Sequence, residues 1–375
     1  MTILTNARLI LPGEFIHGTI ILDGTTIADV QPGRSHAPGA IDCEGDDIIP
    51  GIVDVHTDNL ERQVQPRANA RWPSRSAFLA HDAQCAAAGV TTVLDALCLG
   101  DLGFEQDRDQ TFVDGVRDLT EMHATGLMKS DHLLHLRCEL PAEDMPRMLD
   151  TVADHPLVAM ISVMDHSPGI GQYRDLARYI KMRVRQTNWD EAQVMRRIEE
   201  LREKRERVVP GHRAWVLERV AARGLPVASH DDETAEQIAE HARLGIRIRE
   251  FPVTMEAALA ALALNVPVIV GAPNLVRGGS HSGNVSAMEI ARAGALDTIA
   301  SDYVPAGMIE AAYLCAPVIG LAPAIASITA NPARMCRMVD RGRLQAGLRA
   351  DVVRVRHHAG LPFIRAVWRE GARVA

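Results

Sequence analysis

A chain of 375 residues, 47% hydrophobic and 23% charged, is large enough to bury an extensive core as a globular protein. Its formal net charge of −8 argues against nucleic acid or an anionic membrane as the main partner, although a local basic cluster can still bind an anionic small molecule. The segment from Met1 to Gly13 lacks the pattern of a secretion signal, so we expect a cytoplasmic protein.

Strand-like runs at both ends of the chain predict a small β domain. Residues 3–30 contain three short runs separated by Pro-Gly and Asp-Gly turns, and similar runs return at 352–356 and 363–369. We therefore expect residues 1–48 and 343–375 to form one β-sandwich domain, which brings the termini together. Residues 49–342 would form the hydrolase domain.

The central part of the chain alternates apolar strand-like runs with helical stretches, which is typical of a parallel α/β fold. Eight runs can be counted, at residues 50–59, 91–95, 132–139, 158–165, 226–230, 246–251, 267–270 and 298–302. Eight βα units predict a closed (β/α)8 TIM-like barrel. An open doubly wound sheet is the alternative, although no Gly-rich phosphate loop follows the first strand.

Two stretches need separate interpretation. The link between the fourth and fifth strands, residues 169–224, is long, and its charged middle predicts a solvated helix; a lid over an anionic ligand is the alternative. Residues 311–330 carry no charged side chain, but Pro317 and Pro323 interrupt them, so we predict a buried helix. The six cysteines are scattered, which predicts reduced and mostly buried thiols.

Potential metal ligands follow five of the predicted strands. His56 and Asp58 lie two residues apart and share one face of the first strand by alternation. In a closed barrel all such strand ends converge on one mouth, where unpaired charges are costly to bury. A divalent metal, or two sharing a carboxylate, would offset the repulsion better than a metal-free polar network. The predicted ligands are His56, Asp58, Glu139, His166, His230 and Asp302.

Longer motifs resemble a known family. Pro50-Gly51-x-x-Asp54-x-His56, Ser301-Asp302 and a terminal Gly347-x-x-Ala350-Asp351 resemble the amidohydrolase superfamily over essentially the whole chain. Within it, the chain is similar to the diphosphatases of the carbon–phosphorus lyase pathway, which convert α-D-ribose 1-methylphosphonate 5-triphosphate to the 5-phosphate and pyrophosphate. The matching segments are residues 56–61, 71–73, 81–84, 135–139, 164–166, 278–284 and 301–305.

This resemblance implies a metal-dependent hydrolase of phosphonate catabolism with one or two Zn, Mn or Mg ions. Asp302 would be the general base that takes a proton from the attacking water. Asp58 stands where the superfamily usually has a second histidine, and Glu250-Phe251 ends the sixth strand where many relatives have one. We therefore expect a cage with more oxygen ligands.

A polyanionic substrate also needs cations outside the acidic cage. The loop after the first strand supplies Arg67 and Arg71, whose guanidinium groups suit phosphate oxygens. The Gly-rich loop after the seventh strand is the second phosphate-binding candidate, with Asn274, Arg277, Ser280 and His281. Alternatively, these arginines are ordinary surface charges and the Gly-Gly pair is a flexible turn.

Two other functional interpretations remain open at this point. An amidohydrolase or deaminase would cleave a C–N bond of a cyclic amide or nucleobase, and it would not need two arginine-bearing loops. A non-catalytic scaffold would show gaps in the ligand set. The sequence leaves the oligomeric state open, with a homo-oligomer among the alternatives.

Overall fold

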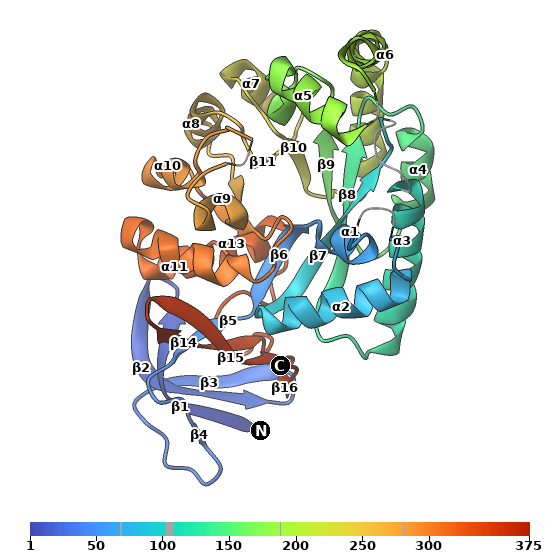
Figure 1. Ribbon diagram of the computed structural model, residues 1–375. Helices are drawn as coiled ribbons and strands as arrows, with labels where there is room; N and C mark the ends of the chain where they lie inside the picture. The colour runs from blue at the N-terminus through green and yellow to red at the C-terminus, as the bar shows by residue number, and fades with distance from the viewer. Residues whose placement is uncertain (68–69, 103–107, 188, 281) are drawn as a thin grey trace.

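A parallel sheet of eight strands forms the centre of the larger part of the molecule (Figure 1). The computed structural model describes residues 1–67, 70–102, 108–187, 189–280 and 282–375. The strands are adjacent in chain order: β6(Ile52–Thr57), β7(Val90–Leu99), β8(Asp131–Glu139), β9(Val158–Met164), β10(Val227–His230), β11(Ile248–Glu250), β12(Val268–Gly271) and β13(Thr298–Ala300). Each predicted strand is present.

The first and last strands of this sheet meet at their carboxyl ends. Thr57 and Asp302 form a parallel bridge, and the Asp302 N–H donates to the His56 carbonyl at 3.0 Å. Apolar side chains from opposite strands, including Val55, Met160 and Ile269, belong to one buried cluster, which can only lie inside the curved sheet. The prediction of a TIM-like barrel is confirmed.

Helices pack around the outside of the barrel strands (Figure 1). For example, Phe112 and Leu119 of the third helix belong to the same buried cluster as Leu97 of β7. The helices that follow the strands are α1(Asn59–Val64), α2(Ser74–Ala87), α3(Arg108–Thr125), α4(Met145–Val152), α7(Ala235–Arg243), α8(Met255–Ala263), α9(Ala272–Val276), α10(Ala287–Arg292), α11(Gly307–Ile319), α12(Leu321–Ala326) and α13(Ala330–Met335).

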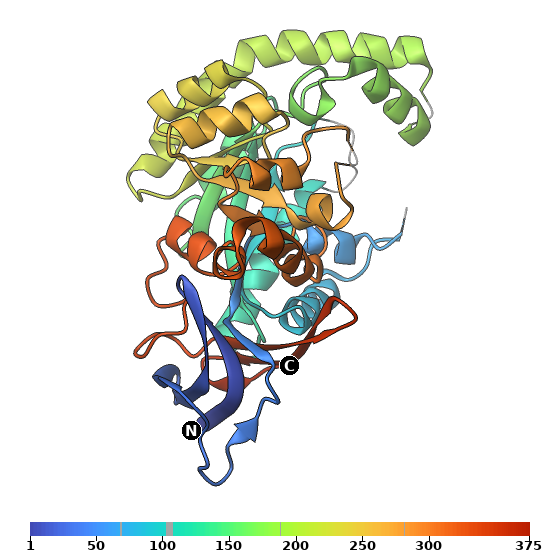
Figure 2. The ribbon, with the colours of Figure 1, turned by 90° about the vertical axis from the view of Figure 1, so that its left-hand side faces the viewer.

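Both ends of the chain build a second, mixed sheet, as predicted. Its order is β16-β15-β14-β5-β1-β2-β3, and β4 also pairs with β1. Strand β5 joins the two halves, because it runs parallel to β1 and antiparallel to β14. Figure 2 shows both termini in this sheet, at the end of the molecule away from α6. The strands are β1(Thr2–Leu11), β2(Glu14–Asp23), β3(Thr26–Pro32), β4(Ile41–Asp42), β5(Asp47–Pro50), β14(Val352–His358), β15(Leu361–Arg369) and β16(Ala372–Arg373).

The long link between β9 and β10 is helical. It contains the short 3₁₀ turn η1(Gly171–Tyr173), then α5(Leu176–Gln186) and the 31-residue α6(Glu191–Ala221), which lies along the top of the molecule in Figure 2. Asp190 and Gln193 form a capping box that begins α6. The predicted charged helix is therefore present. Its Val194 and Ile198 pack against Tyr179 of α5, and apolar side chains farther along it, such as Val216, pack against the barrel helices and strands.

The apolar run at 311–330 is divided between α11 and α12 by Gly320, whose φ of 93° ends the first of these helices. Within the described ranges, no helix combines the length and the apolar character that crossing a bilayer requires. All six cysteines are buried and unpaired, in agreement with the expectation of reduced thiols.

Candidate metal centre

Three residues within two positions of the carboxyl ends of barrel strands have a left-handed backbone. Asp231, Phe251 and Asp302 have φ of 60°, 54° and 58°. Each one donates its N–H to a carbonyl of the adjacent strand: Asp231 to Glu250, Phe251 to Ile269 and Asp302 to His56, all at 2.9–3.0 Å. This conformation costs roughly 1–2 kcal/mol for a residue with a Cβ atom. The sheet therefore holds strained residues at its carboxyl edge, where functional sites often store strain.

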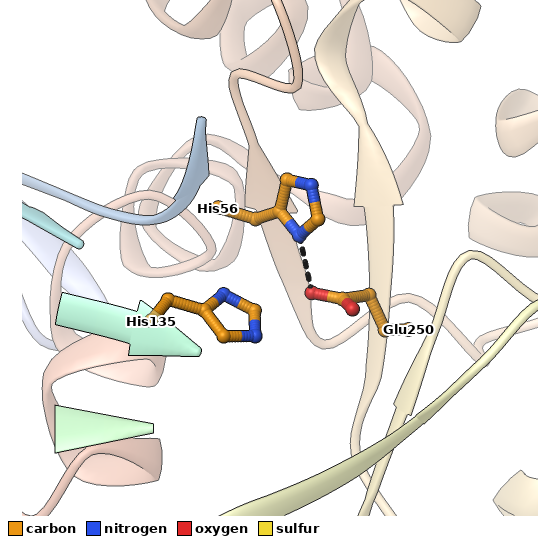
Figure 3. Close-up of side chains that lie close together, drawn as sticks. All are labelled: His56, His135 and Glu250. Carbon is orange, nitrogen blue, oxygen red and sulfur yellow. Dashed lines mark hydrogen bonds and ion pairs between the residues drawn. The ribbon is translucent and has the colours of Figure 1, made fainter. Parts of the chain in front are cut away.

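Buried carboxylates orient three histidines at the same edge. Glu250 accepts from Nδ1 of His56 and from Nδ1 of His230, both at 2.7 Å. Glu139 accepts from Nδ1 of His166 at 2.6 Å. Figure 3 shows Nδ1 of His56 directed at Glu250 and the other ring nitrogen turned away from it. Because Nδ1 donates to a carboxylate, Nε2 of each ring is the atom directed toward a metal, which is the usual arrangement of metal-bound histidine.

Neighbouring histidines stabilise the negative charges of Glu250 and Glu139. Burial opposes ionisation of Glu250, but His56 and His135 outweigh it and keep the pKa of Glu250 well below its usual value. Burial likewise opposes ionisation of Glu139, and His166 lowers the pKa of Glu139 to about 2. Both groups are therefore anionic acceptors at neutral pH.

The Nε2 atoms face two groups of oxygen ligands. Asp231 Oδ2 lies 3.8 Å from Nε2 of His166 and 3.7 Å from Nε2 of His230. In the described part of the chain, neither His166 Nε2 nor Asp231 Oδ2 has a hydrogen-bond partner. Two ligand atoms at this separation can both reach one ion with bonds of about 2.0–2.2 Å. The donor set therefore fits a divalent metal.

The second group combines His56, Asp58 and Asp302, with His56 Nε2 at 3.6 Å from Asp58 Oδ1. It lies beside the first group, because the rings of His56 and His230 stack with centroids 5.9 Å apart. Burial opposes the charge of His56, but Glu250 and Asp58 raise its pKa to about 10. Metal binding would therefore release a proton from this histidine.

Asp58 and Asp302 differ in charge although they are neighbours. Burial opposes ionisation of Asp58, but Arg137, which donates Nη1 to Asp58 Oδ1 at 2.6 Å, lowers the pKa of Asp58. Burial and the adjacent Asp58 charge raise the pKa of Asp302 to about 7. Two carboxylates with pKa values driven apart are typical of an acid–base site.

No protein-family model matches the chain. It is 37% identical over 376 residues to the α-D-ribose 1-methylphosphonate 5-triphosphate diphosphatase of Escherichia coli strain K12, and the match covers 99% of this chain and 100% of that protein. The chain belongs to this diphosphatase family.

Solved structures with the same fold are more distant in sequence. An amidohydrolase has a TM-score of 0.62 at 16% identity and covers 99% of this chain and 98% of its own. An N-acetyl-D-glucosamine-6-phosphate deacetylase from Mycobacterium smegmatis has a TM-score of 0.63 at 17% identity, with both chains fully covered. Both likenesses support the assignment of a barrel with a small second domain.

Most of the metal ligands that were predicted from the sequence lie close together in the structure. The structure gathers His56, Asp58, His166, His230 and Asp302 at the barrel mouth. Glu139 lies behind His166, since one carboxylate oxygen accepts from the ring and the other from the His166 backbone N–H at 2.8 Å.

Two cavities open next to these ligands. The first, about 290 Å³, is named the loop cavity because Asn274, Arg277, Ser280 and Ser282 of the loop after β12 line it. The second, about 240 Å³, is named the arginine cavity, and Arg108, Arg137 and Arg183 line it. Asn274 holds the loop by hydrogen bonds to the Val285 carbonyl and the Ala287 N–H, both at 3.0 Å. His281 lies outside the described residues.

The two predicted arginines after β6 lie elsewhere. Arg71 donates to Thr111 Oγ1 at 2.9 Å and to Asp114 Oδ2 at 3.0 Å, so it connects its loop to α3. Arg67 is exposed, and its backbone pairs with Ala70. Neither is among the described residues that line the two cavities.

Sequence reasoning missed the roles of Asp231, Glu250 and the arginine cavity. Asp231 follows His230 directly, so its position at the end of a predicted strand could have indicated a metal ligand. Glu250 ends a buried strand, where a carboxylate is costly unless it has partners. Arg183 could not be located, because its helix belongs to the long link whose path the sequence does not specify.

Proposed function

We propose that this chain hydrolyses α-D-ribose 1-methylphosphonate 5-triphosphate to the 5-phosphate and pyrophosphate, as a step of phosphonate catabolism. The full-length 37% identity to the Escherichia coli diphosphatase carries the proposal. Two features of the site support it. The mouth holds six clustered residues that could bind metal, and arginines line both adjacent cavities, as a substrate with several phosphoryl charges requires.

The proposed metal ligands are His56, Asp58 and Asp302 for one divalent ion, and His166, His230 and Asp231 for a second. Each set mixes imidazole nitrogen with carboxylate oxygen, which suits Zn, Mn or Mg. When bound, such ions would lower the pKa of a water molecule and neutralise charge on the phosphoryl oxygens. Glu139 and Glu250 are proposed to orient the histidines rather than to bind metal.

The protein's own groups supply the proton transfer and the positioning. Asp302 is proposed to accept the proton of the water that attacks the α-phosphorus, because its carboxylate lies at the barrel mouth in one group with His56 and Asp58. Arg137 holds Asp58 at a fixed place between the two cavities. Arg277 and Ser280 are proposed to bind an anionic part of the substrate from the loop cavity.

Cleavage of a C–N bond is the competing activity, because proteins with this fold include the deacetylase compared above. Binding of an uncharged cyclic amide does not require a cavity lined by Arg108, Arg137 and Arg183. The arginine cavity therefore favours the diphosphatase.

The proposal is tested by elemental analysis of the purified protein together with a pyrophosphate-release assay. The wild-type protein should contain a divalent metal and release pyrophosphate from the ribose triphosphate. His56→Ala should lose metal and activity, whereas His358→Ala, which changes an exposed histidine on β14, should retain both. Cleavage of cyclic amides with the triphosphate left intact would refute the proposal.

A further inference from the structure

The loop cavity and the arginine cavity meet at the metal-ligand cluster. Three residues line both of them, namely Asp58, Arg137 and Gln172. Both cavities are also lined by proposed metal ligands. His56, His230 and Asp302 line the loop cavity, and His166 lines the arginine cavity. A substrate that is cleaved at the cluster can therefore extend one end into each cavity.

Three arginines converge on the arginine cavity. Its three arginines come from three separate elements, with Arg108 at the start of α3, Arg137 on β8 and Arg183 on α5. Among its described lining residues, Leu102 is the only aliphatic side chain. Four carboxylates also line it, namely Asp58, Glu61, Asp101 and Glu139. Asp58 binds Arg137 and Glu139 binds His166.

Arg183 is held in this cavity by the inserted helices. It is only 9% exposed, although it lies on a strongly charged helix, and burial of a guanidinium requires compensation. Its guanidinium lies over the rings of Tyr173 and Tyr179, at 5.7 Å and 5.0 Å from the centroids, and Nη1 donates to Gln186 at 3.1 Å. Stacking on aromatic faces fixes the plane of the guanidinium and directs its N–H edge to an in-plane acceptor.

The loop cavity has a different character. Apart from the shared Arg137, its described lining includes one arginine, Arg277, next to the hydroxyls of Ser280 and Ser282. Its other walls include apolar side chains such as Phe251 and Val285. This mixture suits a sugar ring and a single phosphonate better than two linked phosphates.

We propose that the leaving pyrophosphate binds in the arginine cavity and that the ribose 1-methylphosphonate end binds in the loop cavity. This orientation rests on the proposed function. It assigns Arg183, from the helical link between β9 and β10, as a substrate-binding residue. It also gives that link a role in selecting substrates with a polyphosphate chain.

The test is calorimetric titration of the metal-loaded protein with inorganic pyrophosphate and, separately, with ribose 1-methylphosphonate 5-phosphate. Arg183→Gln should weaken pyrophosphate binding by tenfold or more and change binding of the sugar product less than twofold. Arg277→Gln should show the reverse. Arg185→Gln, which changes an exposed arginine two residues away on the same helix, should affect neither ligand.

Arg183→Lys should recover part of the pyrophosphate affinity, which separates lost charge from a disturbed fold. The proposed orientation would be overturned if Arg183→Gln weakened binding of the sugar product and Arg277→Gln weakened binding of pyrophosphate. It would also be overturned if Arg183→Gln bound pyrophosphate as tightly as the wild-type protein. The proposed function fails in a different way. If the wild-type protein released no pyrophosphate from the ribose triphosphate, the reaction would be wrong, while selective loss of pyrophosphate binding in Arg183→Gln would still establish the arginine cavity as a site for linked phosphates.

Discussion

Glu250 and His56 form a fully buried pair, with Nδ1 of the histidine 2.7 Å from Oε1 of the carboxylate. The other carboxylate oxygen accepts from His230 at 2.7 Å and from the Ser162 hydroxyl at 2.8 Å. One carboxylate therefore orients a histidine in each of the two proposed metal-ligand groups. This relationship explains why a glutamate at the end of the sixth barrel strand is compatible with a metal centre.

Glu250→Gln should weaken metal binding and activity by about 10- to 100-fold, the usual cost of losing a group that orients a metal ligand. The amide keeps the size of the side chain, but its N–H₂ cannot accept from the second histidine. The measurement is metal titration combined with the pyrophosphate-release rate. Glu200→Gln on the exposed face of α6 is the control. Unchanged metal affinity in Glu250→Gln would remove the orienting role.

Asp302→Asn should reduce kcat by about 10²- to 10⁴-fold, the usual contribution of general acid–base catalysis, because the amide cannot take a proton from water. The amide retains an oxygen for coordination, so metal content should fall much less than kcat. Steady-state kinetics and elemental analysis of the same preparation check both points. Asp297→Asn, which affects a surface ion pair with Arg334, provides the comparison. Near-normal kcat in Asp302→Asn would identify another residue as the base.

Gly171→Ala should displace the Asp231 side chain, although Gly171 lies in the link between β9 and β10. Gly171 has φ of +54°, and a Cβ atom there would lie 2.8 Å from Cβ of Asp231. We expect a loss of affinity of about tenfold, equivalent to roughly 1.4 kcal/mol, for the metal proposed to bind His166, His230 and Asp231. Metal titration is the readout.

Gly126→Ala is the matched control, because Gly126 also has a positive φ of +67° but has nothing within 4 Å of the added Cβ. It should lower stability by a similar backbone strain without changing metal affinity. Equal metal affinity in the two variants would show that Gly171 does not position Asp231.

A separate buried network connects α2 with β7 and β8. His132 donates Nδ1 to Asp95 at 2.8 Å and Nε2 to Asp82 at 3.2 Å, while His81 donates Nε2 to the other Asp95 oxygen at 2.6 Å. Nδ1 of His81 accepts from Asn59 at 2.9 Å. Because every ring nitrogen is engaged, we interpret this group as structural. Burial opposes the charge of His132, but Asp95 and Asp82 raise the pKa of His132 to about 9.

This network predicts a pH-dependent stability. The folded-state pKa of His132 lies above the unfolded value of about 6.5, so its contribution is complete below about pH 6.5 and is lost as the pH rises through 9. The contribution is at most roughly 3 kcal/mol. The thermal midpoint of His132→Gln should therefore fall furthest below that of wild type at pH 6 and approach it at pH 9.5. Exposed His36→Gln should show no such convergence.

The sequence predicted the barrel because its signals are local. Each strand is an apolar run bounded by turn residues, and a polar or charged side chain at the carboxyl end of such a run must be paired or functional. His56, His166, His230 and Asp302 were found in this way. The same local patterns predicted that strands at both termini form one β domain.

The sequence by itself thus determined the fold and most of the proposed ligands, whereas only the tertiary structure decided which partners each ligand has. Glu250 meets His56 across 194 positions of the chain, and Arg137 meets Asp58 across 79. Arg183 reaches the site on α5, far from any motif. Contacts of this kind depend on the closure of the barrel and on the path of the inserted helices. Periodicity and spacing cannot reveal them, because both report only on near neighbours in the chain.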